Sequence, residues 1–177
     1  TVMVAGNKCD RMIPLAQRHK NLPDMYDIKT KLLNEEKNKY HHEKKIGMPL
    51  VLNNYDLLPF WNAFFDVLNM EVVWSSPSTK SMYRSAQQNI PSDTACFPAK
   101  LVHGHIDELI KEKNVDVIFY PCMTYNIDEH QSDNHYNCPM VTSYPEVIKN
   151  NIDEIKKQEI NFISPFISLN NEEKLAK

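Results

Sequence analysis

The sequence predicts an α/β domain of three layers, built around a mainly parallel β-sheet. Apolar runs of strand length alternate along the chain with amphipathic stretches of helix length. This is the order of elements that produces a parallel sheet with helical crossovers. The chain has 177 residues, of which 42% are hydrophobic and 24% are charged. It is therefore long enough to bury a core and has the composition of an ordinary globular protein.

Residues 1–44 differ from the rest of the chain. Turn sequences occur at residues 6–11 and 21–24, and residues 30–45 are rich in Lys, Glu, Asn and His. We expect an irregular charged arm or linker from an upstream domain over 1–44, followed by a cysteine-bearing α/β domain over 45–177. The first residues show no signal-peptide pattern. The sequence starts at Thr1 and lacks an initiator Met. We therefore expect the chain to be a piece of a larger protein.

The first half of the expected domain contains two strands and two helices. An apolar run at residues 46–52 predicts a strand, and residues 71–74 predict a second one. Between them, apolar and aromatic side chains recur at helical spacing over residues 55–69 and predict an amphipathic helix. A polar helix is expected over residues 79–89.

The second half contains the clearest helix and the most buried strand. Residues 98–113 have a proline at their start, an apolar face and lysines at their end, which predicts a helix. Residues 115–120 form a β-rich run broken by Pro121, which is typical of a buried strand. The remaining expectations are a loop to Cys138, a strand at 140–142, a helix at 145–157 and a strand at 160–163. This order indicates a flavodoxin-like or Rossmann-like domain.

Several features of the sequence exclude classes of function. The three glycines lie far apart, so neither the glycine-rich dinucleotide motif nor a P-loop is present. A net charge of −3 provides no field that would attract nucleic acid or an anionic membrane. No apolar run approaches the ~20 residues that span a bilayer. Four cysteines without a signal peptide predict a reducing, cytoplasmic location, where thiols are ligands or core residues.

Three cysteines are expected at one edge of the sheet, where functional groups gather beyond the carboxyl ends of parallel strands. Cys122 directly follows the buried strand, and Cys96 immediately precedes the clearest helix. Cys138 precedes the strand expected at 140–142, so its loop must bring it to the same edge. A helix N-terminus supplies free N–H groups and a positive dipole end, which stabilise a thiolate or an anionic cluster.

Spacing alone leaves three interpretations of these cysteines open. Their intervals of 26 and 16 residues form no CxxC pair, and simple buried thiols are common. Zinc is the second interpretation, because four histidines lie near the cysteines in sequence: His103, His105, His130 and His135. The third is an iron–sulfur cluster, which takes thiolate ligands on its irons, usually four. Three ligands would leave one iron open to water, substrate or a fourth residue.

Several stretches resemble the 2-hydroxyacyl-CoA dehydratase family. Residues 89–105, which contain Cys96, are similar to a segment of this family. They are closest to the region that follows the ATPase in long CoA-substrate-specific enzyme activase proteins. Further stretches match in order at residues 48–61, 119–122, 133–139 and 142–149. The resemblance covers residues 46–168, and residues 6–9 fit the preceding segment.

The resemblance implies a 4Fe–4S cluster held by cysteines, sensitivity to oxygen, and an ATP-dependent activator as the electron donor. In the dehydratases, one electron passes through the cluster to an acyl-CoA thioester and forms a ketyl radical that eliminates water. Cys96, Cys122 and Cys138 lie in the family's motifs, and Cys9 matches a family cysteine within the arm. The chain departs from the long activase proteins because it has no ATPase portion.

Three polar residues are candidates for roles beside the ligands. Lys100 is placed to contact a CoA phosphate at the helix start, or to be solvated. Asn134 and His135 are placed to hydrogen-bond cluster sulfides, or to form an ordinary polar loop. We expect an iron–sulfur redox domain that passes single electrons from an ATP-dependent activator to an acyl-CoA-type substrate. The alternatives are a non-catalytic α/β docking domain and a zinc-binding structural domain.

Overall fold

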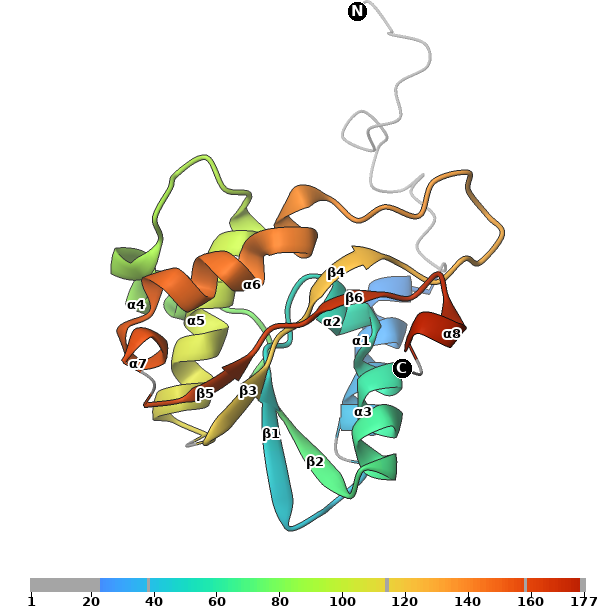
Figure 1. Ribbon diagram of the computed structural model, residues 1–177, viewed down its shortest axis with the longest axis horizontal. Coiled ribbons are helices and arrows are strands. Elements are labelled where there is room, and N and C mark those ends of the chain that lie inside the picture. Colours follow the sequence, from blue (N-terminus) through green and yellow to red (C-terminus); the bar gives the residue numbers. More distant parts are fainter. Residues whose placement is uncertain (1–22, 38, 114, 158, 176–177) are drawn as a thin grey trace, which may run out of the picture.

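A computed structural model describes residues 23–37, 39–113, 115–157 and 159–175 (Figure 1). Its main sheet has four strands in the order β2-β1-β3-β5, and every neighbouring pair is parallel. The strands are β1 (Lys44–Met48), β2 (Met70–Trp74), β3 (Val117–Phe119) and β5 (Asn161–Ile163). The predicted mainly parallel sheet is therefore confirmed.

Two of these strands continue past a proline into a second parallel pair. The outer strands are β4 (Cys122–Tyr125) and β6 (Phe166–Ser168). On the near side of the bend, the Tyr120 N–H donates to the carbonyl of Ile163 at 2.9 Å. On the far side, the Cys122 N–H donates to the carbonyl of Pro165, also at 2.9 Å. Pro121 and Pro165 have no N–H to donate, so they bend the two strands while the hydrogen bonds on either side keep them paired.

The helices near the N-terminus cover one face of the main sheet. They are α1 (Met25–Lys37), α2 (Asn53–Asp56) and α3 (Leu58–Val67). Helix α3 packs on β2, and α1 packs on α3. The core on this side contains Leu33 of α1, Trp61 and Phe65 of α3, and Phe119 of β3. Helix α1 therefore adds a layer to this face of the α/β domain, although it precedes residue 45.

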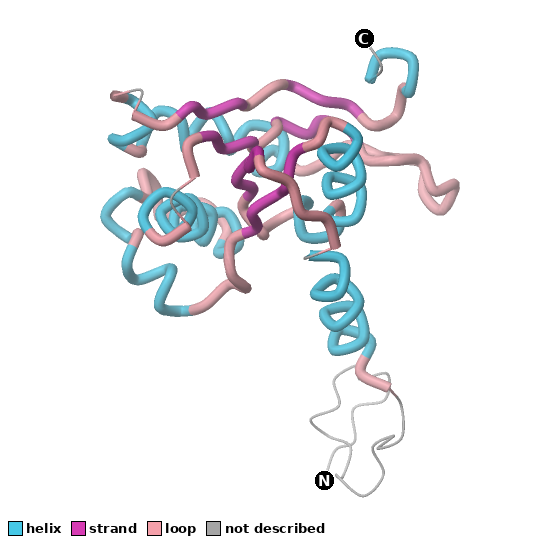
Figure 2. Tube along the Cα trace, turned by 90° about the horizontal axis from the view of Figure 1, so that it is seen from below, coloured by secondary structure: helices cyan, strands magenta, loops and turns pink. Residues whose placement is uncertain are grey.

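Helices from the middle of the chain cover the opposite face. They are α4 (Lys80–Ser85), the 3-10 turn η3 (Gln87–Asn89), α5 (Phe97–Lys111), α6 (Pro139–Asn151) and α7 (Asp153–Lys156). Ile118 of β3 belongs to the core on this side, whereas its neighbour Phe119 belongs to the other core. This alternation across the strand confirms the three-layer arrangement, and Figure 2 shows the strands between two groups of helices. A short helix, α8 (Glu172–Leu175), follows β6.

The path of the chain reverses direction across the sheet between β1 and β3. From β1 the chain passes through α3 to β2, and it then returns over the opposite face through α5 to β3. The segments that leave β1 and β3 therefore run to opposite faces of the sheet. In such sheets, ligands bind outside the carboxyl ends of the strands at this reversal. Tyr120, Pro121 and Cys122 follow directly from the end of β3.

One predicted element is wrong. The strand expected at 140–142 is the beginning of helix α6, which starts at Pro139. Proline fits the first helical position because its N–H would be unsatisfied there. Val141, Tyr144 and Ile148 are buried at helical spacing, so this apolar face outweighs the strand preference of the β-branched residues. In addition, β4 occupies part of the segment expected to be a loop.

Candidate functional site

Cys122 lies just beyond the carboxyl end of β3, and its side chain is 0% exposed. Burial raises the pKa of its thiol to about 11, and the negative charge of Glu146 adds to the effect. A backbone hydrogen bond from Glu146 and the positive charge of Lys149 act in the opposite direction without cancelling it. Cys122 is therefore a neutral thiol at neutral pH unless a bound group replaces its proton.

Cys96 and Cys138 each stand immediately before a helix. Cys96 precedes α5 and Cys138 precedes α6, and each helix has a proline in its first two positions. Both cysteines are exposed. The prediction that Cys138 precedes a strand is therefore corrected, because it stands at a helix N-terminus as Cys96 does. Helices that return the chain between parallel strands begin at the carboxyl edge of the sheet, so both thiols belong to the edge that carries Cys122.

A buried tyrosine, Tyr120, lies two residues before Cys122 on the same sheet edge. Tyr120 is 1% exposed, and its hydroxyl has no hydrogen-bond partner among the described residues. Burial raises the pKa of Tyr120, and the charges of Tyr144, Cys122, Cys138 and Cys96 raise it further. Electrostatic influence of this kind requires proximity. The three predicted ligands therefore all act electrostatically on one buried hydroxyl group.

A tyrosine–histidine pair adjoins this group. The Tyr144 hydroxyl lies 3.1 Å from His103 Nε2, and the two rings are nearly perpendicular at 89°. Burial lowers the pKa of His103 to about 4, so its ring is neutral at neutral pH. Burial raises the pKa of Tyr144, and the nearby charge of Cys96 raises it further. Tyr144 thus contacts a neutral histidine and is influenced electrostatically by one of the three thiols.

His105, two residues further along α5, has a structural role. Its Nδ1 lies 2.8 Å from the Ser75 hydroxyl, and its Nε2 lies 2.8 Å from the Ser78 hydroxyl. The Ser75 hydroxyl also accepts the N–H of Leu50 at 2.8 Å, which ties the end of β1 to the end of β2. Burial lowers the pKa of His105 to about 4. Because both ring nitrogens are engaged with serines, His105 supports the sheet edge.

The loop before Cys138 holds two of the predicted polar residues. His135 Nε2 lies 3.3 Å from Asp128, and His130 lies 3.2 Å from the same carboxylate. The Asn134 side chain accepts the N–H of Tyr136 at 3.1 Å. A small cavity of about 210 Å³ lies under this loop, and both Asn134 and His135 line it.

Lys100 binds the chain just before Cys96. Its ammonium group donates to the carbonyl of Asp93 at 2.7 Å and lies 3.8 Å from the carboxylate of the same residue. The side chain is 14% exposed. Lys100 thus holds the loop that carries Cys96 against the first turn of α5. A CoA phosphate would compete with Asp93 for the Lys100 ammonium group.

The loop after β1 contributes polar atoms that sequence reasoning missed. Asn54 is fully buried, and its amide donates to the carbonyl of Pro49 at 3.2 Å. Asn54 Oδ1 and Asn53 Nδ2 are buried without a partner within the part of the chain that is described. Leu52 has a φ of 53°, which is unusual for a leucine. Unpaired polar atoms and a strained residue are typical of a ligand-facing loop, but no motif in the sequence marks them.

The structure does not assemble a site for a single metal ion within residues 23–37, 39–113, 115–157 and 159–175. No group of three or more His, Cys, Asp or Glu side chains in these ranges is placed to hold one. Cys9 lies outside the described residues. An iron–sulfur cluster takes each thiolate on a different iron, and for Cys96, Cys122 and Cys138 it stays a prediction.

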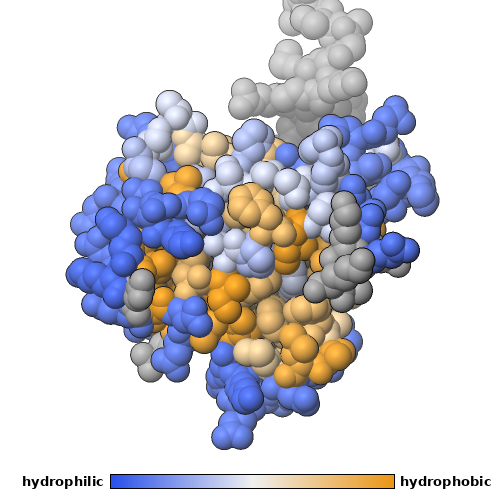
Figure 3. Space-filling view, viewed as in Figure 1, coloured by the Kyte–Doolittle hydropathy of each residue, from blue (hydrophilic) through white to orange (hydrophobic). Residues whose placement is uncertain are grey.

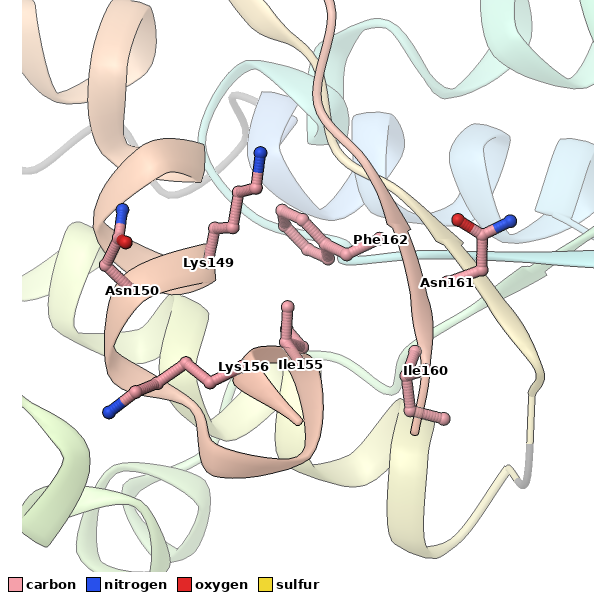
Figure 4. Close-up of a pocket in the computed structure, with 7 residues that line it drawn as sticks. All are labelled: Lys149, Asn150, Ile155, Lys156, Ile160, Asn161 and Phe162. Atoms are coloured by element: carbon pink, nitrogen blue, oxygen red, sulfur yellow. The ribbon is translucent and has the colours of Figure 1, made fainter. Parts of the chain in front are cut away.

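A further cavity lies beside edge strand β5. It measures about 570 Å³, and Figure 4 shows its lining: Lys149, Asn150, Ile155, Lys156, Ile160, Asn161 and Phe162. Lys149 extends toward the ring of Phe162, whereas Lys156 and Asn150 point away from it (Figure 4). The cavity contains no cysteine or histidine, and its lysines carry no recognisable sequence motif.

Exposed apolar side chains gather over α3, β5 and β6, where Figure 3 is orange. A groove of about 430 Å³ runs through this area. We call it the α3–β6 groove, and its main lining residues are Phe60, Phe64, Phe119, Phe166 and Ile167. Phe166 is 67% exposed and Phe64 is 42% exposed. Large exposed aromatic residues grouped in this way mark a surface that contacts another molecule.

The fold and the site define an α/β domain with three cysteines at the carboxyl edge of a mainly parallel sheet. Residues 45–177 match the family described as the CoA enzyme activase uncharacterised domain. The chain belongs to this family, which confirms the activase-related part of the resemblance, and the dehydratase relationship stays a prediction. No curated protein and no solved structure matches the chain. No helix in the described ranges is long and apolar enough to cross a membrane.

Proposed function

We propose that this domain holds a 4Fe–4S cluster on Cys96, Cys122 and Cys138 and passes single electrons through it. The observation that supports the proposal is the placement of these thiols, with Cys122 just beyond the carboxyl end of β3 and Cys96 and Cys138 each immediately before a helix. They come from three different elements, separated by 26 and 16 residues, yet they belong to one sheet edge.

The physical chemistry of the three positions suits an anionic cluster. Cys96 and Cys138 place two helix N-termini at the site, and both favour negative charge. Both thiols are exposed, so iron and sulfide can reach them. Cys122 would release its proton on binding iron, as metal-bound thiols do. Cys9 is the candidate fourth ligand, and without it one iron keeps an open position.

The family relationship supports a partner and a substrate class for this redox domain. A CoA enzyme activase relationship favours an ATP-dependent activator as the electron donor and an acyl-CoA-type molecule as the acceptor. The reaction would be of the 2-hydroxyacyl-CoA dehydratase type. Asn134 and His135 would then be the polar neighbours on the Cys138 loop, and Lys100 would keep the Cys96 loop in place.

The test is anaerobic reconstitution of the full chain with iron and sulfide, followed by metal analysis and EPR. We expect brown protein with absorbance near 400 nm that fades in air. Single changes of Cys96, Cys122 or Cys138 to Ser should each lower bound iron severely. Cys9→Ser tests the fourth ligand position. A mild loss of iron would show that three ligands suffice, and a severe loss would identify Cys9 as the fourth ligand. Circular dichroism checks that each variant is folded.

Two results would contradict the proposal. One is wild-type protein that binds no iron under these conditions, and the other is iron binding that survives replacement of all three cysteines. Zinc bound to protein purified without oxygen would instead favour the zinc-binding structural domain. The absence of oxygen matters, because oxidative loss of iron would let zinc occupy the empty thiolates.

The α3–β6 groove favours a second candidate, a docking domain that binds an ATP-dependent activator without chemistry of its own. Phe64→Glu and Phe166→Glu should each weaken such a complex at least tenfold, because both side chains line the groove. Val67→Glu is the control, since Val67 is 81% exposed on the same helix but does not line the groove. A complex that persists after all cysteines are replaced would support docking. If the three glutamate substitutions weaken the complex equally, the docking role of the groove is contradicted.

A further inference from the structure

A cavity of about 410 Å³ is lined by helix α1 and by the loops that follow two strands of the sheet. Asn53 follows the carboxyl end of β1, and Asn126 directly follows β4, which continues β3 beyond Pro121. β1 and β3 are the neighbouring strands between which the path of the chain reverses across the sheet. The cavity therefore occupies the position at which open α/β sheets bind their ligands.

The lining of this cavity includes a hydrogen-bond donor that lacks an acceptor. Asn53 lines the cavity, and its Nδ2 atom is buried and unpaired among the described residues. A buried N–H without a partner costs about 1–3 kcal/mol, and an acceptor oxygen on a ligand would remove that cost. Leu52, immediately before it, has φ 53° and ψ −137°, a backbone conformation that is strained for leucine. Strain beside an unpaired donor is typical of a loop that contacts a ligand.

The charged groups of the cavity carry a negative balance. The Lys29 ammonium group pairs with the carboxylate of Asp56 and lies 5.7 Å from the centre of the Tyr55 ring. Lys29 and Asp56 both line the cavity, and Glu129 adds a second carboxylate to it. Because Lys29 neutralises only one of the two carboxylates, an anionic ligand is disfavoured. Glu129 provides an acceptor for a hydroxyl or another neutral donor.

We propose that this cavity binds a small uncharged molecule with two neighbouring hydroxyl groups, such as a nucleoside or a free sugar. A hydroxyl group both accepts and donates hydrogen bonds. One hydroxyl oxygen accepts the unpaired Asn53 N–H, and the second hydroxyl donates to the Glu129 carboxylate. Leu57 and Ile127 complete the lining with apolar surface for the carbon atoms of the ligand. The volume is that of a small-molecule site, and the site uses none of the four cysteines.

The first test is isothermal titration calorimetry of the full chain with adenosine and with D-ribose. Binding of adenosine but not of ribose would assign the site to a nucleoside, and equal or better binding of ribose would assign it to a free sugar. 2′,3′-Dideoxyadenosine, which lacks both hydroxyl groups, should bind at least about tenfold more weakly than adenosine. The proposal is overturned if neither adenosine nor ribose binds at millimolar concentration. It is also overturned if adenosine and its dideoxy analogue bind equally.

The second test changes the lining and repeats the titration with the probe that binds. Asn53→Ala and Glu129→Ala should each weaken binding about tenfold, because each removes one of the two hydrogen bonds. Gln131→Ala is the matched control, since Gln131 lies on the same loop as Glu129 but does not line this cavity. Glu129 is exposed, so its replacement tests the site even if Asn53→Ala disturbs the fold, which circular dichroism reports.

Equal weakening by Glu129→Ala and Gln131→Ala would overturn the proposal. Iron binding by the reconstituted protein should be the same in Glu129→Ala as in the wild type, because the two sites share no residue. Failure of this proposal would therefore leave the proposed cluster untouched, and failure of the cluster would leave this site untouched.

Discussion

Cys96 and Cys138 occupy equivalent backbone positions at the starts of two helices that pack against each other. Cys96 has φ −62° and ψ 155°, and Cys138 has φ −64° and ψ 157°. Neither helix has a side-chain hydrogen bond from its capping residue, so both thiols remain available to another partner. Serine, threonine or aspartate would cap these helices better. Cysteine at these two positions therefore leaves both helices less stable than a capping residue would.

The three thiols should differ sharply in reactivity in the folded, iron-free protein. Cys96 and Cys138 are exposed, whereas Cys122 is buried and its thiol pKa is raised to about 11. A water-soluble alkylating reagent at pH 8 should modify Cys96 and Cys138 at least tenfold faster than Cys122, since thiolates react and thiols do not. Peptide mass spectrometry measures the three sites, and urea-unfolded protein is the control in which all react. Rapid alkylation of Cys122 in the folded state would contradict the structure.

Protein stability should fall as the pH is lowered from about 6.5 to about 4. The ordinary pKa of His105 is 6.5 and its folded-state value is about 4, with Glu108 and Lys37 as its charged neighbours. Within this window the unfolded chain binds a proton that the folded protein does not, so protons favour unfolding. His105 should contribute a loss on the order of 2 kcal/mol, and His103, with the same shift, a similar one.

Urea unfolding at several pH values measures this dependence. His105→Asn should make the pH dependence of the free energy of unfolding shallower across the window. Replacement of His41, whose side chain is 73% exposed, is the control and should leave it unchanged. An unchanged slope in His105→Asn would show that this histidine is not held neutral by the fold.

Asn62→Ala should loosen the N-terminal helix from the sheet. The Trp74 indole N–H donates to Asn62 Oδ1 at 2.8 Å, and the Asn62 amide donates to the carbonyl of Glu36 in α1. Removal of the side chain leaves a buried N–H unpaired, which costs about 2 kcal/mol. Chemical denaturation followed by tryptophan fluorescence tests this. Asn150→Ala, on the exposed side of α6, should change the free energy of unfolding by less than about 0.5 kcal/mol.

Gly104→Ala should destabilise the protein although alanine is the better helix former. A Cβ at Gly104 would lie 2.5 Å from the carbonyl oxygen of Met82, because α5 and α4 approach closely there. Moving α4 aside costs about 1–3 kcal/mol, while the gain in helix propensity is at most about 1 kcal/mol. A lower urea midpoint without a change in slope is expected, and a higher midpoint would contradict the close approach.

The sheet could be predicted because its strands are short apolar runs separated by amphipathic helices. β1, β2, β3 and β5 all overlap predicted runs. β4 and β6 were missed because both are short and neither has an alternating pattern of its own. Cys138 was placed before a strand because Val141 and Thr142 are β-branched, whereas Tyr144 and Ile148 complete a buried helical face.

The candidate site could be predicted only in part. The edge position of Cys122 could be predicted because this residue directly follows a predicted strand. The edge position of Cys96 could be predicted because this residue precedes a predicted helix. Their shared electrostatic influence on Tyr120 depends on how α5 and α6 pack over β3, which local spacing does not encode. The same is true of the His103–Tyr144 pair, whose members are 41 residues apart. The cluster itself, the activator and the acyl-CoA-type substrate stay predictions.

The bend at Pro121 and Pro165 links the buried thiol to the last strands of the chain. The Cys122 N–H donates to the carbonyl of Pro165, so the pairing of β5 and β6 at the sheet edge holds the backbone of one candidate ligand, while α3 and α5 pack on the rest of the sheet. Local opening of this C-terminal edge would release Cys122 without melting the core. The amide of Cys122 should then exchange with solvent together with the amides of β6, and faster than those of β1.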